Sequence, residues 1–270
     1  MSRSFVVTGA ASGIGASLAR ELLRRGECVC AADIRTEPLE ALRSLAADAQ
    51  QLRIEALDVR DPAAWERVIA NAAAAWGGLD VLLNVAGVLR SGYVYEATPD
   101  DVHFHFDINA KGVIFGTQAA ARLMVKQRRG HIVNVASLAG IAPVPGISLY
   151  SASKFAVRGY SLAVAPELQP HGVRVSVVCP DAVRTPMLDI QADDERAAMT
   201  FSGSRSLTTD EVTAAIVDEV LPKAPLELIL PRGRGLLAKL ASALPGVNAR
   251  LAGSMKKRGL ARQRREHNAR

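Results

Sequence analysis

A tyrosine and a lysine four residues apart, Tyr150 and Lys154, stand in the apolar segment LYSASKFAVRGYS. Positions i and i+4 of an α-helix lie on one face, so the phenol and the ammonium would point the same way. Two unit charges about 4 Å apart at an effective dielectric of ~20 interact by roughly 4 kcal/mol. This would lower the phenol pKa by up to about 3 units and make Tyr150 a general acid or base near neutral pH. The spacing also fits an amphipathic helix whose lysine merely reaches water.

A glycine-rich turn near the N-terminus indicates a phosphate site. In FVVTGAASGIGASLA, Gly9, Gly13 and Gly15 separate an apolar run from a helical pattern, with Ser12 and Ile14 beside the last two glycines. Such glycines let the backbone approach a pyrophosphate at a helix N-terminus. An ordinary strand-to-helix turn is the alternative.

The next apolar run ends in CAADIR, which places Asp33 and Ile34 at a strand end. Asp33 is positioned either to accept hydrogen bonds from an adenosine ribose or to form a turn. A carboxylate on the ribose would repel a 2′-phosphate, which favours NAD over NADP. Arg35 would oppose that preference.

Short apolar runs alternate with helical patterns along the chain. Alternation of this kind predicts an α/β fold, a Rossmann-like doubly wound single domain with a seven-stranded parallel sheet and helices on both faces. The strand candidates are Phe5–Thr8, Cys28–Ala32, Leu52–Leu57, Val81–Leu83, His131–Val135, Arg174–Val178 and Leu226–Leu230.

Composition separates a body, residues 1–231, from a basic C-terminal extension, residues 232–270. The extension holds eleven Lys/Arg and one acid, a net charge of +10, whereas the body holds 22 bases and 26 acids, a net charge of −4. Three cysteines, an odd number, predict a reducing, cytoplasmic compartment. No run of 18 apolar residues occurs, so no membrane span is expected.

The motifs together resemble the short-chain dehydrogenase/reductase family, in its branch of about 250 residues, over roughly residues 4–231. They occur in the family's order: Thr8 to Gly15, Asp58-Val59, Asn84-Val-Ala-Gly87, Asn109, Ser137 and Tyr150-x-x-x-Lys154. The resemblance implies a catalytic tetrad of Asn109, Ser137, Tyr150 and Lys154, with Asn109 positioning a water that relays the proton. A buried Asn satisfied by backbone is the alternative for that residue.

The resemblance also implies a set of cofactor contacts. Asp58 and Val59 would contact the adenine, and the segment Asn84, Ala86 and Gly87 would line the cleft. Pro180 lies in the segment CPDAVRTPM, where Val183 and Thr185 would contact the nicotinamide carboxamide. Two positions depart from the family pattern. Val85 replaces a second asparagine, and Asp181 replaces a glycine and brings a charge near the nicotinamide.

Together these features predict an oxidoreductase acting on a hydrophobic alcohol or ketone. A segment from about Met187 to Ser206 corresponds to the family's substrate lid, and its apolar residues suggest such a substrate. The alternatives are a non-enzymatic NAD-binding sensor or scaffold and, less favoured by spacing and length, a sugar-nucleotide epimerase or dehydratase. No metal site is expected, because His103 and His105 do not share a helix face and are expected on the helix surface or in a subunit contact. No nucleic-acid-reading motif accompanies the basic charges.

The family resemblance implies a homo-oligomer, a tetramer or else a dimer, formed by the helices that hold Asn109 and Tyr150. Outward-facing Ala119, Ala120, Ala156 and Ala163 would allow these helices to approach closely.

The extension begins as an amphipathic helix with Leu236, Leu237, Leu240 and Leu244, which Pro245-Gly246 should end. A second, short helix with Leu251 and Met255 is expected next, and a disordered end over residues 259–270. The leucines are expected to cap the substrate pocket or a subunit interface. The less favoured alternative is contact of the basic face with an anionic membrane surface.

Overall fold

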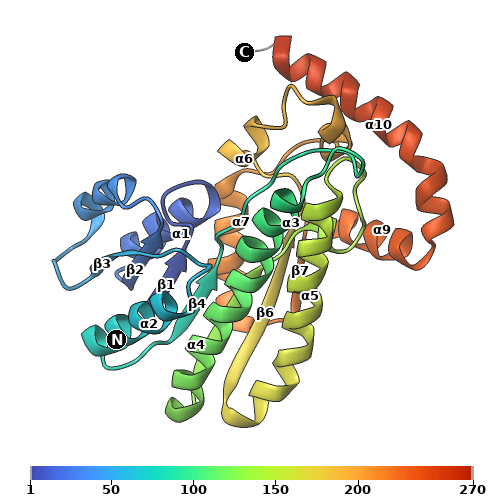
Figure 1. The fold of residues 1–270 in the computed structure, drawn as a ribbon. Coiled ribbons are helices and arrows are strands. Elements are labelled where there is room, and N and C mark those ends of the chain that lie inside the picture. The colour runs from blue at the N-terminus through green and yellow to red at the C-terminus, as the bar shows by residue number, and fades with distance from the viewer. Residues whose placement is uncertain (1, 269–270) are drawn as a thin grey trace.

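The computed structural model describes residues 2–268, except for the side chains of residues 245, 247–249, 251 and 266–268. Seven parallel strands form one sheet in the order β3-β2-β1-β4-β5-β6-β7 (Figure 1). The strands are β1 (Ser4–Thr8), β2 (Cys28–Asp33), β3 (Leu52–Ala56), β4 (Val81–Asn84), β5 (Gly130–Val135), β6 (Val173–Pro180) and β7 (Glu227–Leu230). The predicted Rossmann-like sheet is confirmed.

Helices cover both faces of the sheet, because alternate residues of each buried strand point to opposite sides. Phe5 and Val7 of β1 belong to the core beneath α1 (Gly13–Arg24) and α7 (Thr209–Ala215). Val6, between them, belongs to the core beneath α2 (Pro62–Trp76), α4 (Gly112–Gln127) and α5 (Ser148–Leu168).

Shorter helical segments connect these elements. The 3₁₀-helices are η1 (Glu37–Leu45), η3 (Leu138–Gly140), η4 (Gln169–His171) and η5 (Glu195–Phe201), and the π-helices are η2 (Phe106–Lys111) and η6 (Ile216–Val220). The remaining α-helices are α3 (Pro99–His105), α6 (Pro186–Asp189), α8 (Leu221–Lys223), α9 (Arg232–Ala243) and α10 (Pro245–Asn268).

Local sequence sets where several helices begin and end. Asp61 caps α2 by accepting a hydrogen bond from the Ala63 amide at 2.8 Å, and Pro62 occupies the first helical position. Gly77, at φ +70°, ends the same helix in the left-handed conformation that glycine adopts easily.

The C-terminal extension folds as two helices that pack back onto the body (Figure 1). The predicted break at Pro245 is confirmed, since α9 ends at Ala243 and Pro245 begins α10. The short second helix and the disordered end were wrong, because α10 continues through Asn268. Its Arg, Lys, Gln and Ala residues favour helix, and contact with η5 supplies the packing that the basic sequence alone does not predict. The side chain of Leu251 lies outside the described part. Within residues 2–268, no helix is long and apolar enough to cross a bilayer.

Two predictions about helix faces were also wrong. His105 is buried instead of lying on the helix surface, because its ring binds the Asp101 carbonyl (2.7 Å) and the Arg90 amide (3.0 Å). Ala119 and Ala120 pack within the core beneath α4, because their side of the helix faces the sheet.

Candidate active site

The glycine turn between β1 and α1 is closely packed. A Cβ on Gly9, which has φ +67°, would lie 2.9 Å from the Cα of Ala86. A Cβ on Gly15 would lie 2.2 Å from the Gly9 carbonyl oxygen. Only glycine therefore fits these positions, and the turn leaves the N-terminus of α1 open toward a large cavity that Ser12, Gly13 and Ile14 also line. This geometry fits a pyrophosphate.

Acidic residues stand at the ends of β2 and β3. Asp33 accepts hydrogen bonds from the amides of Ala11 (3.1 Å) and Arg35 (3.0 Å). Its carboxylate thus forms the predicted turn and still lines the cavity, beside Ile34. Asp58 pairs with Arg60 at 2.6 Å, and the hydrogen bonds from Arg60 lower the pKa of Asp58. Val59 also lines the cavity.

The segment after β4 contributes Val85, Ala86 and Gly87 to the cavity wall, but Asn84 lies behind that wall. The Asn84 side chain donates a hydrogen bond to Asn134 Oδ1 at 2.9 Å and is only 2% exposed. We therefore assign Asn84 to holding β4 against β5. Val85, the departure from the family pattern, packs against the core beneath α1.

Ser137, Tyr150 and Lys154 come together at the carboxyl ends of β5 and β6. Ser137 follows β5, and its hydroxyl accepts a hydrogen bond from the Ala139 amide (3.1 Å) and bonds to Tyr150. Lys154 Nζ lies 5.7 Å from the centre of the Tyr150 ring, one helical turn along α5, and donates to the Val135 carbonyl at 3.0 Å. All three residues line the cavity, and Tyr150 and Lys154 are 9% and 3% exposed.

Asn109 lies beneath this group, in the π-helix η2, and does not line the cavity. Its Nδ2 donates to the Val88 carbonyl (2.9 Å) and to Ser153 Oγ (3.0 Å), and its Oδ1 accepts from the Val88 amide (2.8 Å). Both side-chain hydrogens are therefore used within the protein. These hydrogen bonds agree with the backbone-satisfied alternative and tie α5 to the segment after β4. A role of Asn109 in positioning a water stays a prediction.

Burial shifts the pKa values of both Tyr150 and Lys154 in the direction that favours the uncharged side chain. It raises the pKa of Tyr150 to about 12, partly offset by the hydrogen bond with Ser137. Burial likewise lowers the pKa of Lys154 to about 8. Desolvation therefore dominates the pKa of Tyr150 in the protein by itself. Acidification of Tyr150 by Lys154 together with the positive charge of an oxidised nicotinamide ring stays a prediction. Tyr150 is held as a protonated donor.

The segment after β6 is fixed by the C-terminal extension. Pro180, Val183 and Thr185 line the cavity as predicted. The Asp181 carboxylate forms an ion pair with Arg234 at the start of α9. Burial raises the pKa of Asp181, whereas Arg234 acts to lower it. The charge that replaces the family's glycine is thus compensated by the extension.

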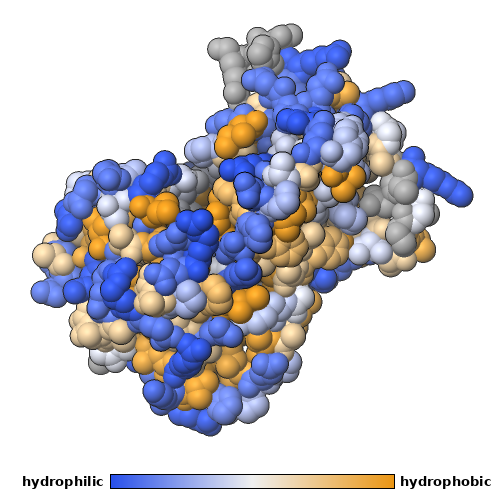
Figure 2. Space-filling model, viewed as in Figure 1, coloured by the Kyte–Doolittle hydropathy of each residue, from blue (hydrophilic) through white to orange (hydrophobic). Residues whose placement is uncertain are grey.

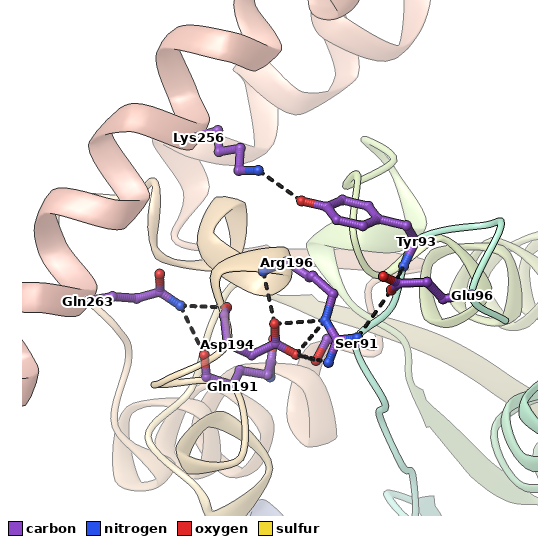
Figure 3. Close-up of polar contacts among 8 residues, drawn as sticks. All are labelled: Ser91, Tyr93, Glu96, Gln191, Asp194, Arg196, Lys256 and Gln263. Carbon is purple, nitrogen blue, oxygen red and sulfur yellow. Dashed lines mark hydrogen bonds and ion pairs between the residues drawn. The ribbon is translucent and has the colours of Figure 1, made fainter.

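The predicted lid, residues 187–206, lies between the segment after β4 and α10 (Figure 3). Arg196 bridges Glu96 (3.1 Å) and Asp194 (2.9 Å), and Asp194 also binds Ser91. On the other side, Gln263 of α10 donates to the carbonyls of Gln191 (2.9 Å) and Asp194 (3.0 Å). These contacts hold the lid from both sides.

Two further residues of α10 complete this contact. Lys256 donates to the Tyr93 hydroxyl at 2.8 Å (Figure 3). Arg262 donates to the Gly203 carbonyl (3.1 Å) and to Ser206 Oγ (2.7 Å). The extension is therefore an integral wall of the site.

The cavity bounded by these elements has a volume of about 1240 Å³. This exceeds the ~300–1,000 Å³ of ordinary small-molecule sites and leaves room for a dinucleotide and a substrate together. Its substrate end is lined by apolar side chains of the lid and the extension: Met187, Leu188, Ile190, Met199, Leu237, Leu240, Leu244 and Met255.

A parallel doubly wound sheet with a phosphate-binding turn, and with a Ser-Tyr-Lys group at the carboxyl ends of its strands, defines a dinucleotide-binding oxidoreductase architecture. The family model for short chain dehydrogenases matches residues 3–196. The chain belongs to the short-chain dehydrogenase/reductase family.

Individual relatives agree with this assignment. The chain is 38% identical over 189 residues, covering 70% of this chain and 72% of the relative, to a 3-alpha-(or 20-beta)-hydroxysteroid dehydrogenase of Mycobacterium tuberculosis. It is 35% identical over 215 residues, 78% of this chain and 86% of the relative, to the NADP-dependent 3-hydroxy acid dehydrogenase YdfG of Salmonella typhi. A short-chain dehydrogenase/reductase of Burkholderia phymatum, solved in complex with NAD, superposes with a TM-score of 0.81 at 25% identity over 92% of this chain and 95% of that one.

Sequence reasoning missed the contribution of Arg234, Gln263 and Gly259 to the site. A Cβ on Gly259 would lie 1.8 Å from the carbonyl oxygen of Ala198, so this glycine allows α10 to pack against η5. The sequence signal was three glycines, Gly246, Gly253 and Gly259, and one glutamine within a basic helix, and nothing in it indicates which of them has a packing partner.

Proposed function

We propose that the protein is an NAD-dependent oxidoreductase that interconverts a hydrophobic, secondary alcohol and its ketone by hydride transfer. The observation that carries the proposal is the buried group of Ser137, Tyr150 and Lys154 at the wall of the cavity. The glycine turn beside it, where a Cβ on Gly9 or Gly15 would clash, fits the phosphates of a nicotinamide dinucleotide.

Each residue has a defined part in the reaction. The nicotinamide ring, when bound, accepts or supplies the hydride. In reduction, the Tyr150 hydroxyl donates its proton to the carbonyl oxygen, and in oxidation the tyrosinate takes the hydroxyl proton of the alcohol. Ser137 donates a hydrogen bond that orients the substrate oxygen. The Lys154 ammonium stabilises the tyrosinate and binds the nicotinamide ribose.

The preference for NAD rests on Asp33. Its carboxylate lines the cavity at the end of β2, where it would repel a 2′-phosphate. YdfG is named as NADP-dependent, whereas the Burkholderia neighbour is described with NAD. Arg35, which lines the same cavity, is the group that would reverse the preference. The ratio of kcat/KM with NAD to that with NADP tests this, and a ratio below one would overturn it.

The named relatives act on a hydroxysteroid or a 3-hydroxy acid. The apolar lid and the leucines of α9 support a substrate with a substantial apolar body. The test is to measure NADH formation over a panel of hydrophobic secondary alcohols. Absence of turnover throughout the panel, with either cofactor, would refute the proposed activity.

We also propose a homo-oligomer, either a tetramer or a dimer, in a cytoplasmic, reducing compartment. Ala152, Ala156, Gly159 and Ala163 are exposed along α5 and would let a second copy of this helix approach closely. Cys30 and Cys179 are buried thiols without a disulfide. A monomer by sedimentation at micromolar concentration would contradict the oligomer.

A further inference from the structure

We infer that the substrate is an elongated apolar molecule with an anionic group, a carboxylate or sulfate, at the end remote from the reacting oxygen, and that Arg258 of α10 binds this group. This inference rests on the proposed function, because the anionic group would bind at the far end of the cavity in which the proposed reaction takes place.

Apolar side chains line the cavity both at its catalytic end and at its mouth. Around Tyr150, the core includes Leu89, Ala139 and Ile147, with Met187 packed against them. At the mouth, Leu237 and Leu240 of α9 and Leu244, the residue after it, line the same cavity and are 66%, 53% and 57% exposed. A ligand that reaches from Tyr150 to α9 would cover these leucines, and removing their surface from water favours binding.

Arg258 is the one cation at this mouth without a partner in the described part of the chain. It lines the cavity beside Ser254 and Met255 and is exposed. Two other arginines of the wall are neutralised, Arg60 by Asp58 and Arg234 by Asp181.

The phosphates of the dinucleotide do not compete for Arg258. They belong at the glycine turn after β1, whereas α9 and α10 follow β7 at the far edge of the sheet. Arg35, the remaining arginine of the cavity wall, follows β2, which three strands separate from β6. The anion that Arg258 binds must therefore belong to the substrate.

Contacts of the residues near Arg258 hold the backbone of α10 in place, so less ordering is needed when the guanidinium binds an anion. Lys256 binds Tyr93, and Gly259 packs directly on Ala198. Figure 2 shows many hydrophilic side chains on the visible surface around α10, and among the described cations of this helix Arg258 is the one that lines the cavity. A guanidinium on a fixed backbone binds a carboxylate through two parallel hydrogen bonds with little further ordering.

The test compares a hydroxylated acid with its neutral ester. The probes are lithocholate, a steroid secondary alcohol with a carboxylate at the opposite end, and its methyl ester. Each is titrated in a calorimeter into full-length protein saturated with NADH, which cannot accept a hydride from the alcohol, so that binding is measured without turnover. We expect Arg258→Gln to weaken lithocholate binding about tenfold, because a charge-assisted hydrogen bond contributes ~1.5 kcal/mol. Binding of the ester should not change.

Arg265→Gln is the matched control, since Arg265 is an exposed cation seven residues further along α10 and does not line the cavity. It should leave both affinities unchanged. Equal lithocholate affinity in wild type and Arg258→Gln, an equal loss in Arg265→Gln, or no lithocholate binding to wild type would each overturn the inference. Turnover of neutral secondary alcohols is measured in parallel. Its absence would refute the proposed function, whereas normal turnover with no effect of Arg258→Gln would refute this inference alone.

Discussion

Substituting Gly259 by alanine tests the packing of α10 on the lid. The new Cβ would lie 1.8 Å from the Ala198 carbonyl oxygen, so α10 must retreat by about 1 Å or more. A shift of that size takes the hydrogen bonds of Gln263 (2.9 and 3.0 Å) and Arg262 (3.1 and 2.7 Å) beyond the usual limit. Four such bonds contribute roughly 4 kcal/mol, and the higher helix propensity of alanine returns about 1 kcal/mol.

The net cost of about 3 kcal/mol would raise the population of undocked α10 about a hundredfold. Trypsin reports this population, because Lys257, Arg258, Arg264 and Arg265 are exposed cleavage sites on the helix. We expect cleavage within α10 to accelerate about a hundredfold in Gly259→Ala, with a higher KM for the substrate.

Gly253→Ala is the matched control, because a Cβ at that exposed position of the same helix meets nothing within 4 Å. It should slow cleavage slightly through helix propensity alone. If Gly259→Ala behaves like Gly253→Ala, α10 is not docked on η5 and the reasoning fails.

Three further perturbations address the site. Lys154→Met should abolish turnover and weaken NAD binding, measured by fluorescence titration, and unchanged affinity would exclude the ribose contact. Because burial raises the pKa of Tyr150 to about 12, its proton-accepting form is scarce at neutral pH, so kcat/KM for oxidation should rise about tenfold per pH unit while reduction stays level. A level oxidation profile would contradict the assignment of Tyr150. Deletion after Pro231 should lower thermal stability and raise KM in plain buffer, because the lid loses Gln263 and Arg262. If the truncated protein is instead unchanged and only the full-length protein sediments with anionic vesicles, the extension serves membrane contact.

The sheet could be predicted from sequence because each strand is a short apolar run and each run is followed by a helical pattern. The glycine turn was also predictable from sequence. Its backbone packs so closely that a Cβ does not fit at Gly9 or Gly15, and this steric requirement appears in the sequence as the glycine spacing.

The faces of helices were less predictable. Ala119 and Ala120 look equally suited to a subunit contact and to a core, and only the position of α4 on the sheet decides between them. The end of the extension, from residue 259, was misjudged because its helical state depends on long-range contacts, such as Gln263 with the Gln191 carbonyl, that no local pattern encodes. The upward shift of the Tyr150 pKa in the protein by itself could not be predicted, because charge spacing is visible in a sequence but burial is not.

The most direct test of the central claim, that Tyr150 transfers the proton at a dinucleotide site, is Tyr150→Phe assayed for NAD binding and for turnover in parallel. Removal of the single hydroxyl should leave the NAD dissociation constant within about twofold, because the aromatic ring still packs against Leu89 and Ile147. Turnover of any active alcohol should fall by about 100- to 10,000-fold, the usual contribution of a general acid or base. Retention of most of the wild-type rate, with NAD bound normally, would contradict the account.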